Sequence, residues 1–400
     1  MSKEVDEPLQ RFCELSQHIN KFTNLLGVDV LAVDLKWNFR TWTTTFAIIN
    51  YTGFTLLSII LNAHDWKECL KISLMLGGLF HGIGKFFTCL FKQSRMRYIT
   101  FYTSNIFKEY EQLSPIYVKI LNIGLDRLLQ IMWILRNGYL VTFLLMTVIP
   151  LGLLFYNGTR VTIMQYQIPG LPLENNISYT ITYIIQIVTI SVAGFGFYAG
   201  DLFVLLALTQ ILTFADILQV KVNKLNESLK GKSAKRAEMA QVGALVEGEY
   251  ERHTILLEVV KWHQEFTSYC RYVNDLYHDL IASQVLSMAM AVMLSFCINL
   301  ISFHLPSAIY FVVSAYSMVV YCILGTKIEF AYDQVYTSIC DISWQELSSK
   351  QRKYFGMVLR EAQRPPTITI LGVMPLSVRT ALQITKLIYS LSMMMMQNRT

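Results

Sequence analysis

Long apolar stretches alternate with shorter polar ones along the whole chain. Most of them are close to the roughly 20 residues that a helix needs to cross a bilayer. They predict membrane-spanning helices at about residues 42–61, 70–91, 131–156, 178–214, 281–303, 309–330 and 367–396. The fourth stretch is too long for a single crossing, so we expect its second half to continue as a helix beyond the bilayer.

The polar segments between these spans also have helical periodicity. Within residues 215–280, apolar side chains such as Leu218, Val222 and Leu225 recur every three or four positions, and residues 331–367 begin with a similar pattern. Such a pattern predicts amphipathic helices, each of which needs something to cover its apolar face.

Composition assigns the class. Hydrophobic residues make up 53% of the chain and charged residues only 16%, whereas soluble domains carry about 25% charged residues. The predicted fold class is therefore all-α, a polytopic membrane protein with seven transmembrane helices. The seven cysteines are scattered without a paired motif, and the sequence has no nucleophile motif, metal cluster or phosphate-binding loop. We expect neither an enzyme nor a metal or cofactor.

The distribution of positive charge predicts the orientation of the chain. If seven spans are assumed, one side of the membrane carries nearly all lysines and arginines of the loops, while the other side carries only Lys67, Arg160 and Arg399. Positive residues favour the cytoplasmic side, so we expect a cytoplasmic N-terminus and an extracellular C-terminus. Asn157 and Asn176 begin glycosylation motifs in the third, outer loop and are candidate modification sites.

This orientation divides the chain into six parts. They are a cytoplasmic N-terminal segment (1–41), spans one to four with the extension of span four (42–214), a cytoplasmic helical loop (215–280), spans five and six (281–330), a cytoplasmic helix (331–367), and a final span with a short extracellular tail (368–400).

Two other classes of membrane protein fit this plan less well. A G-protein-coupled receptor has an external N-terminus, and the sequence lacks both the Asp-Arg-Tyr end of span three and the Asn-Pro-x-x-Tyr of span seven that mark that class. A transporter is less well supported still, because we find no internal repeat and no pair of broken helices at the middle of the membrane.

The last seventy residues carry a recognisable motif. It runs from Trp344 through the segment Arg360–Pro366, then Gly372, the segment Pro375–Ser377, and the segment Leu387–Ser390. This pattern resembles the C-terminal signature of insect odorant receptors, specifically the variable, odorant-tuning subunits of dipteran type. Inverted topology, a length of 400 residues and a long second cytoplasmic loop are also similar to that family's plan. One departure is Cys340, where the family usually has an aromatic residue.

The resemblance implies a ligand-gated, nonselective cation channel in the plasma membrane of olfactory neuron dendrites. The variable subunit would bind the odorant and join a co-receptor subunit in a heterotetramer around a central pore. The cytoplasmic helices of residues 215–280 and 331–367 would form an anchor region shared between subunits.

We expect the ligand, a small uncharged and possibly aromatic volatile, where the outer halves of spans two to six converge, because ligands bind between helices in apolar cavities. The candidate contacts are mostly aromatic, aliphatic or sulfur-containing, with few hydroxyls and no acid. They are Ile72, Leu76, Phe80, His81, Met146, Ile149, Leu153, Tyr179, Tyr183, Gln186, Ile187, Met293, Phe296, Tyr310, Phe311, Ser314 and Tyr316.

The final span is the candidate pore helix, since it carries polar groups at intervals that lipid would not tolerate. The resemblance implies a gate at Tyr389, Ser392 and Met396, which share one helical face. Three ionisable residues lie inside other spans. His81 fits either the pocket or a structural hydrogen bond, Lys85 is expected to extend toward the membrane surface, and Asp201 fits either the cation path or an ion pair in the anchor region.

Overall fold

The computed structural model describes residues 7–34, 36–235 and 242–397, and leaves out the side chains of 231–248 and 395–397. In these ranges the chain forms ten α-helices, one short 3-10 helix and one two-stranded sheet. The elements are α1 (Pro8–Leu25), α2 (Phe39–Leu61), α3 (Trp66–Phe91), α4 (Gln93–Glu111), α5 (Pro115–Asn157), α6 (Asn176–Lys235), α7 (Val242–Ile301), α8 (Leu305–Cys340), η1 (Trp344–Glu346), α9 (Ser349–Ala362), β1 (Thr369–Ile370), β2 (Met374–Pro375) and α10 (Val378–Gln397).

The first six predicted spans are confirmed as α2, α3, α5, α6, α7 and α8, which are long and apolar enough to cross a membrane. The expected extension of span four is also confirmed, because α6 continues for 60 residues to Lys235. The seventh helix, α10, has 20 residues and is more polar, with Arg379 and Lys386 on its exposed surface. The all-α, seven-helix membrane class predicted from composition is therefore the observed one.

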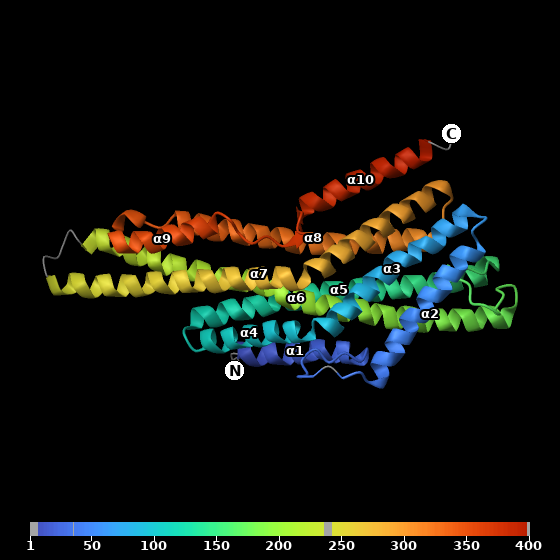
Figure 1. The fold of residues 1–400 in the computed structure, drawn as a ribbon, viewed down its shortest axis with the longest axis horizontal. Helices are drawn as coiled ribbons and strands as arrows, with labels where there is room; N and C mark the ends of the chain where they lie inside the picture. The colour runs from blue at the N-terminus through green and yellow to red at the C-terminus, as the bar shows by residue number, and fades with distance from the viewer. Residues whose placement is uncertain (1–6, 35, 236–241, 398–400) are drawn as a thin grey trace.

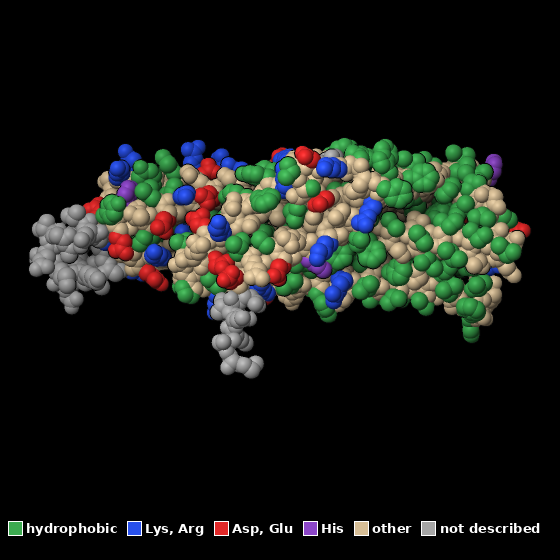
Figure 2. Space-filling view, turned by 90° about the horizontal axis from the view of Figure 1, so that it is seen from below, with side chains coloured by type: hydrophobic (Ala, Val, Ile, Leu, Met, Phe, Trp, Pro, Cys, Tyr) green, Lys and Arg blue, Asp and Glu red, His purple; other side chains and the backbone are tan. Residues whose placement is uncertain are grey.

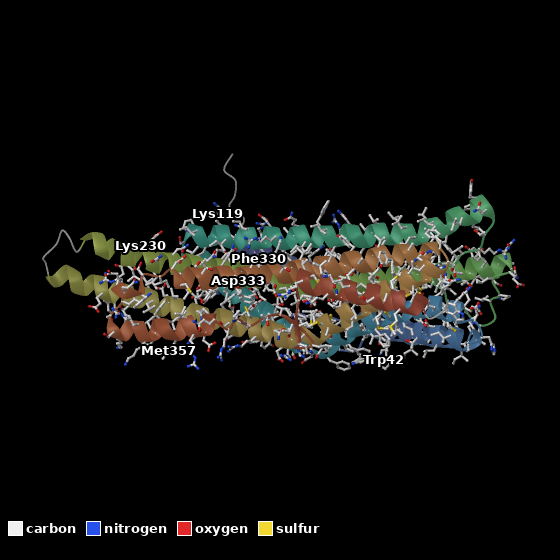
Figure 3. All side chains as sticks on the ribbon, turned by 90° about the horizontal axis from the view of Figure 1, so that it is seen from above. Trp42, Lys119, Lys230, Phe330, Asp333 and Met357 are labelled. Carbon is white, nitrogen blue, oxygen red and sulfur yellow. The ribbon has the colours of Figure 1, made fainter. Side chains whose placement is uncertain are left out.

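The helices form an elongated bundle in which α6 and α7 run along most of the length (Figure 1). One end contains α9 with the far ends of α6, α7 and α8, and the other end contains α2, α3 and the segment between α5 and α6. Charged side chains gather over the end with α9, and hydrophobic side chains cover most of the opposite end (Figure 2). In Figure 3, Lys230 and Met357 lie in the charged part and Trp42 lies toward the apolar part.

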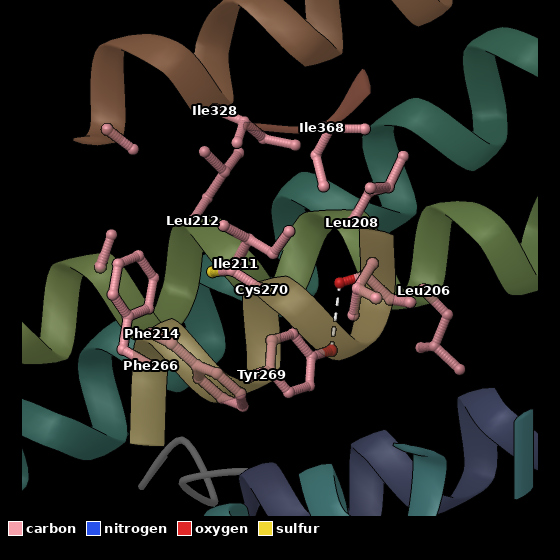
Figure 4. Packing of buried hydrophobic residues seen from close by; sticks show 14 of the residues in the cluster. Leu206, Leu208, Ile211, Leu212, Phe214, Phe266, Tyr269, Cys270, Ile328 and Ile368 are labelled. Carbon is pink, nitrogen blue, oxygen red and sulfur yellow. Dashed lines mark hydrogen bonds between the residues drawn. The ribbon is translucent and has the colours of Figure 1, made fainter. Parts of the chain in front are cut away.

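The middle of α6 is the centre of the main core, and nearly every residue from 202 to 218 is buried. The aromatic face of α7 packs on it (Figure 4), and its polar tips bond to carbonyls of α6, among them the Tyr277 hydroxyl, which donates to the Phe203 oxygen at 3.4 Å. The Tyr269 hydroxyl donates to the Ala207 oxygen at 3.1 Å and the Trp262 indole donates to the Phe214 oxygen at 3.2 Å. Buried aromatic side chains with satisfied polar tips hold two helices at a fixed rotation.

Helices α1 and α4 cover one side of this core. The rings of Phe12 and Phe107 pack with centroids 4.8 Å apart, and both side chains are fully buried. Arg11 of α1 forms an ion pair with Asp126 of α5 at 2.8 Å. Burial raises the pKa of the Tyr110 phenol, at the end of α4, well above its ordinary value. Helix α4 was not expected from the hydrophobic pattern, because its sequence is mixed throughout.

The structure corrects the prediction of one continuous span from 367 to 396. Residues Thr369–Ile370 and Met374–Pro375 pair as antiparallel strands instead, and the chain turns between them with φ of 54° at Leu371 and 70° at Gly372. Helix α10 begins only at Val378. Ile370 and Leu376 of this segment are buried, whereas Leu371 and Val373 at its turn are exposed.

The hairpin sits directly on α8. A Cβ atom placed on Gly325 would lie 1.8 Å from the carbonyl oxygen of Leu376, so only glycine permits this approach. The next residue of α8, Thr326, contributes its hydroxyl, which accepts a hydrogen bond from the Val378 backbone amide at 2.9 Å. The start of α10 is therefore fixed to the middle of α8.

Candidate ligand cavity

A cavity of about 290 Å³ lies inside the membrane-spanning half, between α2, α3, α5 and α6. Tyr310 and Val313 of α8 also line it, as do Ile163 and Met164 from the segment between α5 and α6 and three residues at and just after the end of α1. A volume of this size is near the lower end of the range for small-molecule sites. We take this cavity as the candidate functional site.

The wall presents mostly hydrocarbon to an occupant. Thr142 and Thr189 donate their hydroxyls to carbonyls one turn earlier in their own helices, at 2.7 and 2.8 Å. The Tyr51 hydroxyl donates to the Met75 oxygen at 3.2 Å. Because these groups already have partners, they contribute methyl and ring surface to the cavity. Such a wall favours uncharged molecules held by dispersion.

Tyr310 is different from the other hydroxyl-bearing residues of the wall. Its hydroxyl lies over Gly78, where an added Cβ atom would be only 2.7 Å away. Within the described part of the chain, no hydrogen bond engages this hydroxyl. Buried tyrosine hydroxyls usually have a partner, so Tyr310 offers the cavity one polar contact point for a ligand.

An ion pair forms the floor of the cavity. Lys85 of α3 also lines the wall, and its amine lies 2.5 Å from a carboxylate oxygen of Asp201 on α6. The amine also donates to the Phe197 carbonyl at 3.1 Å. Both charged side chains are almost completely buried, at 2% and 1% exposure. The expectation that Lys85 extends to the membrane surface was wrong, because its acidic partner lies within reach inside the bundle.

Three further helices donate to the same carboxylate. The Tyr139 hydroxyl of α5 donates to one oxygen of Asp201 at 2.5 Å. The Tyr321 hydroxyl of α8 and the Gln284 amide of α7 donate to the other oxygen, the amide at 3.3 Å. Asp201 therefore joins five helices at the base of the cavity. The predicted ion pair of Asp201 exists, but it lies under the ligand cavity and not in the cytoplasmic half.

The segment between α5 and α6 folds over the outer end of the bundle. Gln186 of α6 holds it at both backbone atoms of Met164, accepting from the amide at 3.1 Å and donating to the carbonyl at 2.9 Å. The backbone amide of Gln167 donates to the Ser58 hydroxyl of α2 at 2.8 Å. The Tyr179 hydroxyl donates to the Val161 carbonyl at 3.0 Å. This roof closes the cavity from the outside.

The structure brings only part of the predicted contact set to this cavity. Met146 and Tyr310 line its wall, and Ile149 and Leu153 line a much smaller void beside Met146. Two predicted residues bond to the roof segment, Tyr179 and Gln186, and Tyr183 bonds to the Thr147 carbonyl of α5. Two others, Phe80 and Tyr316, are exposed. The remaining predicted residues line neither space: Ile72, Leu76, His81, Ile187, Met293, Phe296, Phe311 and Ser314.

These differences have one physical reason. The sequence gives the depth of a residue in the membrane, but the rotation of each helix comes from packing. His81 shows this clearly, because its ring stacks on Phe197 with centroids 4.8 Å apart instead of entering the cavity. Residues such as Val188 and Ala193, which do line the wall, carried no signal beyond their apolar character.

Helix α10 packs on α7 and α8 away from the cavity. Ser392 is fully buried there and accepts a hydrogen bond from the Cys297 thiol at 3.3 Å, whereas Tyr389 is 58% exposed. The side chain of Met396 lies outside the described residues. The predicted gate residues Tyr389 and Ser392 therefore have different surroundings in the single chain, and their role stays a prediction.

The two predicted glycosylation residues lie at the roof end of the bundle. Asn157 ends α5 and Asn176 begins α6, and both are exposed. Arg160 donates to the Asn176 amide oxygen. Their modification also stays a prediction.

The ion pair at the cavity floor generates a prediction on stability. Lys85→Met leaves a buried carboxylate without its counter-charge, and Asp201→Asn leaves a buried amine, so each change should cost about 3–5 kcal/mol. The double variant should recover part of this loss. Thermal unfolding of the purified protein in detergent measures all three.

The matched control is Lys71→Met, which removes a partly exposed pair with Glu68. Such pairs contribute about 0–1 kcal/mol, so its melting temperature should change little. A double variant that is as unstable as the two single losses added together would contradict a direct interaction between Lys85 and Asp201.

Comparison with known proteins identifies the family. The family model described as 7tm Odorant receptor matches residues 65–389. The chain is 63% identical to "Putative odorant receptor 83c" of Drosophila melanogaster over 391 residues, which are 98% of each protein. Solved structures of the insect olfactory receptor OR5 from Machilis hrabei, alone and in complex with eugenol, superpose with a TM-score of 0.73 at 13% identity, covering 96% of this chain and 99% of that one. This chain therefore belongs to the insect odorant receptor family.

Proposed function

We propose that this chain is the odorant-binding subunit of a ligand-gated, nonselective cation channel. The observation that carries the proposal is the apolar cavity between transmembrane helices, with the Tyr310 hydroxyl as its one contact point free of a protein partner among the described residues. Such a site suits a small uncharged volatile recognised by shape and one hydrogen bond. The OR5 complex with eugenol is a related protein with an uncharged aromatic ligand.

A second part of the proposal is assembly into a heterotetramer with the odorant receptor co-receptor. Arg379, Gln383, Lys386 and Ser390 form an exposed polar stripe along α10, at a spacing that places them on one face. Polar side chains that face lipid are costly, so such a stripe calls for water or another subunit. A central pore surrounded by four α10 helices provides water for this stripe.

The gate follows from the same helix. We propose that the exposed stripe faces the closed pore and that Tyr389 and Ser392, with Met396, approach the pore when α10 turns away from α7. In the single chain the Cys297 thiol donates to Ser392, so this contact holds α10 in its present rotation.

The cytoplasmic parts of α6, α7 and α8, with α9, form the proposed anchor region between subunits. The proposed location is the plasma membrane of olfactory neuron dendrites, with the N-terminus in the cytoplasm and the C-terminus outside. This orientation supports the channel class over a G-protein-coupled receptor, which has an external N-terminus.

The main experiment records current from cells that express this chain, the co-receptor, or both. Cells with both should respond to members of a panel of small uncharged volatiles that includes eugenol, while cells with this chain alone should not respond. The current should persist in excised patches without GTP. Loss of the response in excised patches, with recovery on adding a G protein, would contradict the channel class and support a G-protein-coupled receptor.

Tyr310→Phe tests the contact point of the cavity. The half-maximal concentration should rise about two- to tenfold for activating volatiles with a hydrogen-bonding group, since one hydrogen bond contributes about 0.5–1.5 kcal/mol. It should stay unchanged for hydrocarbon analogues. Dose–response curves measure this effect. The control is Tyr316→Phe on the same helix, whose hydroxyl already donates to the Ile134 carbonyl at 3.0 Å away from the cavity. Equal shifts for both ligand types would contradict the assignment.

Two variants of α10 separate pore lining from packing. Gln383→Glu adds a negative charge to the exposed stripe and should change relative ion permeability if that stripe lines the pore. Ser392→Ala removes the acceptor for Cys297 and should change the current before odorant, because the contact that holds α10 in its present rotation is lost. Reversal potentials and basal current are the measurements. Unchanged reversal potentials in Gln383→Glu would contradict pore lining by the stripe, and unchanged basal current in Ser392→Ala would contradict the proposed hold of Cys297 on α10.

A further inference from the structure

The cavity wall is exposed to the surroundings at one side only. Of the residues that line it, three are exposed, and all of them belong to α2 or α6: Ala47, Val188 and Val192. Residues at its outer end, such as Met146 and Met164, are buried, and so are Thr23 and Cys89 at its inner end. The opening of the cavity is therefore lateral, between α2 and α6.

The opening lies at the depth of the membrane interior. Val188 follows the start of α6 at Asn176 by twelve residues, which is about 18 Å along a helix axis. Ala47 lies well inside α2, which runs from Phe39 to Leu61. Both positions are in helices long and apolar enough to span a bilayer, so the opening faces hydrocarbon and not water.

Packing at this place leaves room for a passage. Helix α2 packs mainly on α3, and no substantial packing joins it to α6 among the described residues. The facing part of α6 carries the small residues Ala193, Gly194 and Gly196. A Cβ atom on Gly194 would meet nothing within 4 Å, and one on Gly196 would meet only Leu26, at 3.5 Å.

The path into the cavity from the extracellular side is blocked by the roof segment between α5 and α6. The roof segment is bonded to α6 through both backbone atoms of Met164 and to α2 through the Gln167 amide. Reaching the cavity from the extracellular side would require these hydrogen bonds to break together. Buried backbone groups without partners are costly, so this route has the higher barrier.

We propose that the ligand reaches and leaves this cavity sideways from the bilayer, through the gap between α2 and α6. The proposal rests on the proposed odorant-binding role of the cavity and narrows its ligand class. The ligand must be uncharged and must partition into hydrocarbon before it binds. A more lipophilic ligand of equal fit then binds faster, because its concentration at the opening is higher.

Bulky residues at the rim test this route. Ala47→Phe and Val188→Phe narrow the gap from opposite sides. Because the same barrier is crossed in both directions, the onset and the decay of the current should each slow by at least about threefold, whereas a change confined to ligand contacts would alter mainly the decay. The probe is the strongest activator in the volatile panel, applied in short pulses to cells that also express the co-receptor.

Matched controls separate the rim from the rest of the surface. Ile49→Phe on α2 and Ile177→Phe on α6 enlarge exposed residues that do not line the cavity, and the rates should be unchanged. Ser58→Ala removes the acceptor for the roof at Gln167, and it should not speed the response.

Three outcomes would overturn the proposal. They are unchanged rates in both rim variants, a raised half-maximal concentration with normal rates, and a faster response in Ser58→Ala. Silence of the unmodified receptor toward the whole panel would count instead against the proposed function, so the two failures are distinguishable.

Discussion

The buried ion pair of Lys85 and Asp201 determines how the membrane-spanning half is assembled. A carboxylate in a low-dielectric interior is stable only when donors surround it, and here the donors come from α3, α5, α7 and α8. Because all of them must reach the same two oxygens, the helices cannot shift independently of one another. The cavity rests on this junction, so its floor is the most constrained part of its wall.

Much of this architecture could be read from the sequence, because membrane spans are a matter of length and apolar composition. The six spans α2, α3, α5, α6, α7 and α8 and the great length of α6 followed from that pattern. Lys85 and Asp201 also stood out as ionisable residues within spans. Their pairing could not be predicted, since they are on different helices and nothing in the sequence states which helices are neighbours.

The site was less accessible to sequence analysis for a related reason. Depth in the membrane pointed to Met146 and Tyr310, which do line the cavity, and also to Phe80 and Tyr316, which face outward. Only packing settles helix rotation. The tail shows a second limit, because its apolar residues fit one span, yet Gly372 and Pro375 belong to a hairpin that packs on α8.

Helix α8 links parts of the receptor that otherwise lie apart. Along its 36 residues it carries Tyr310 at the cavity, Tyr321 at the ion pair, and Gly325 under the hairpin that starts α10. Wall residues such as Ala47 of α2 and Val188 of α6, by contrast, are not among the groups that donate to Asp201. A substitution at such a position reshapes the cavity and leaves the junction intact. A substitution on α8 can act on the cavity, the ion pair and the start of α10 together.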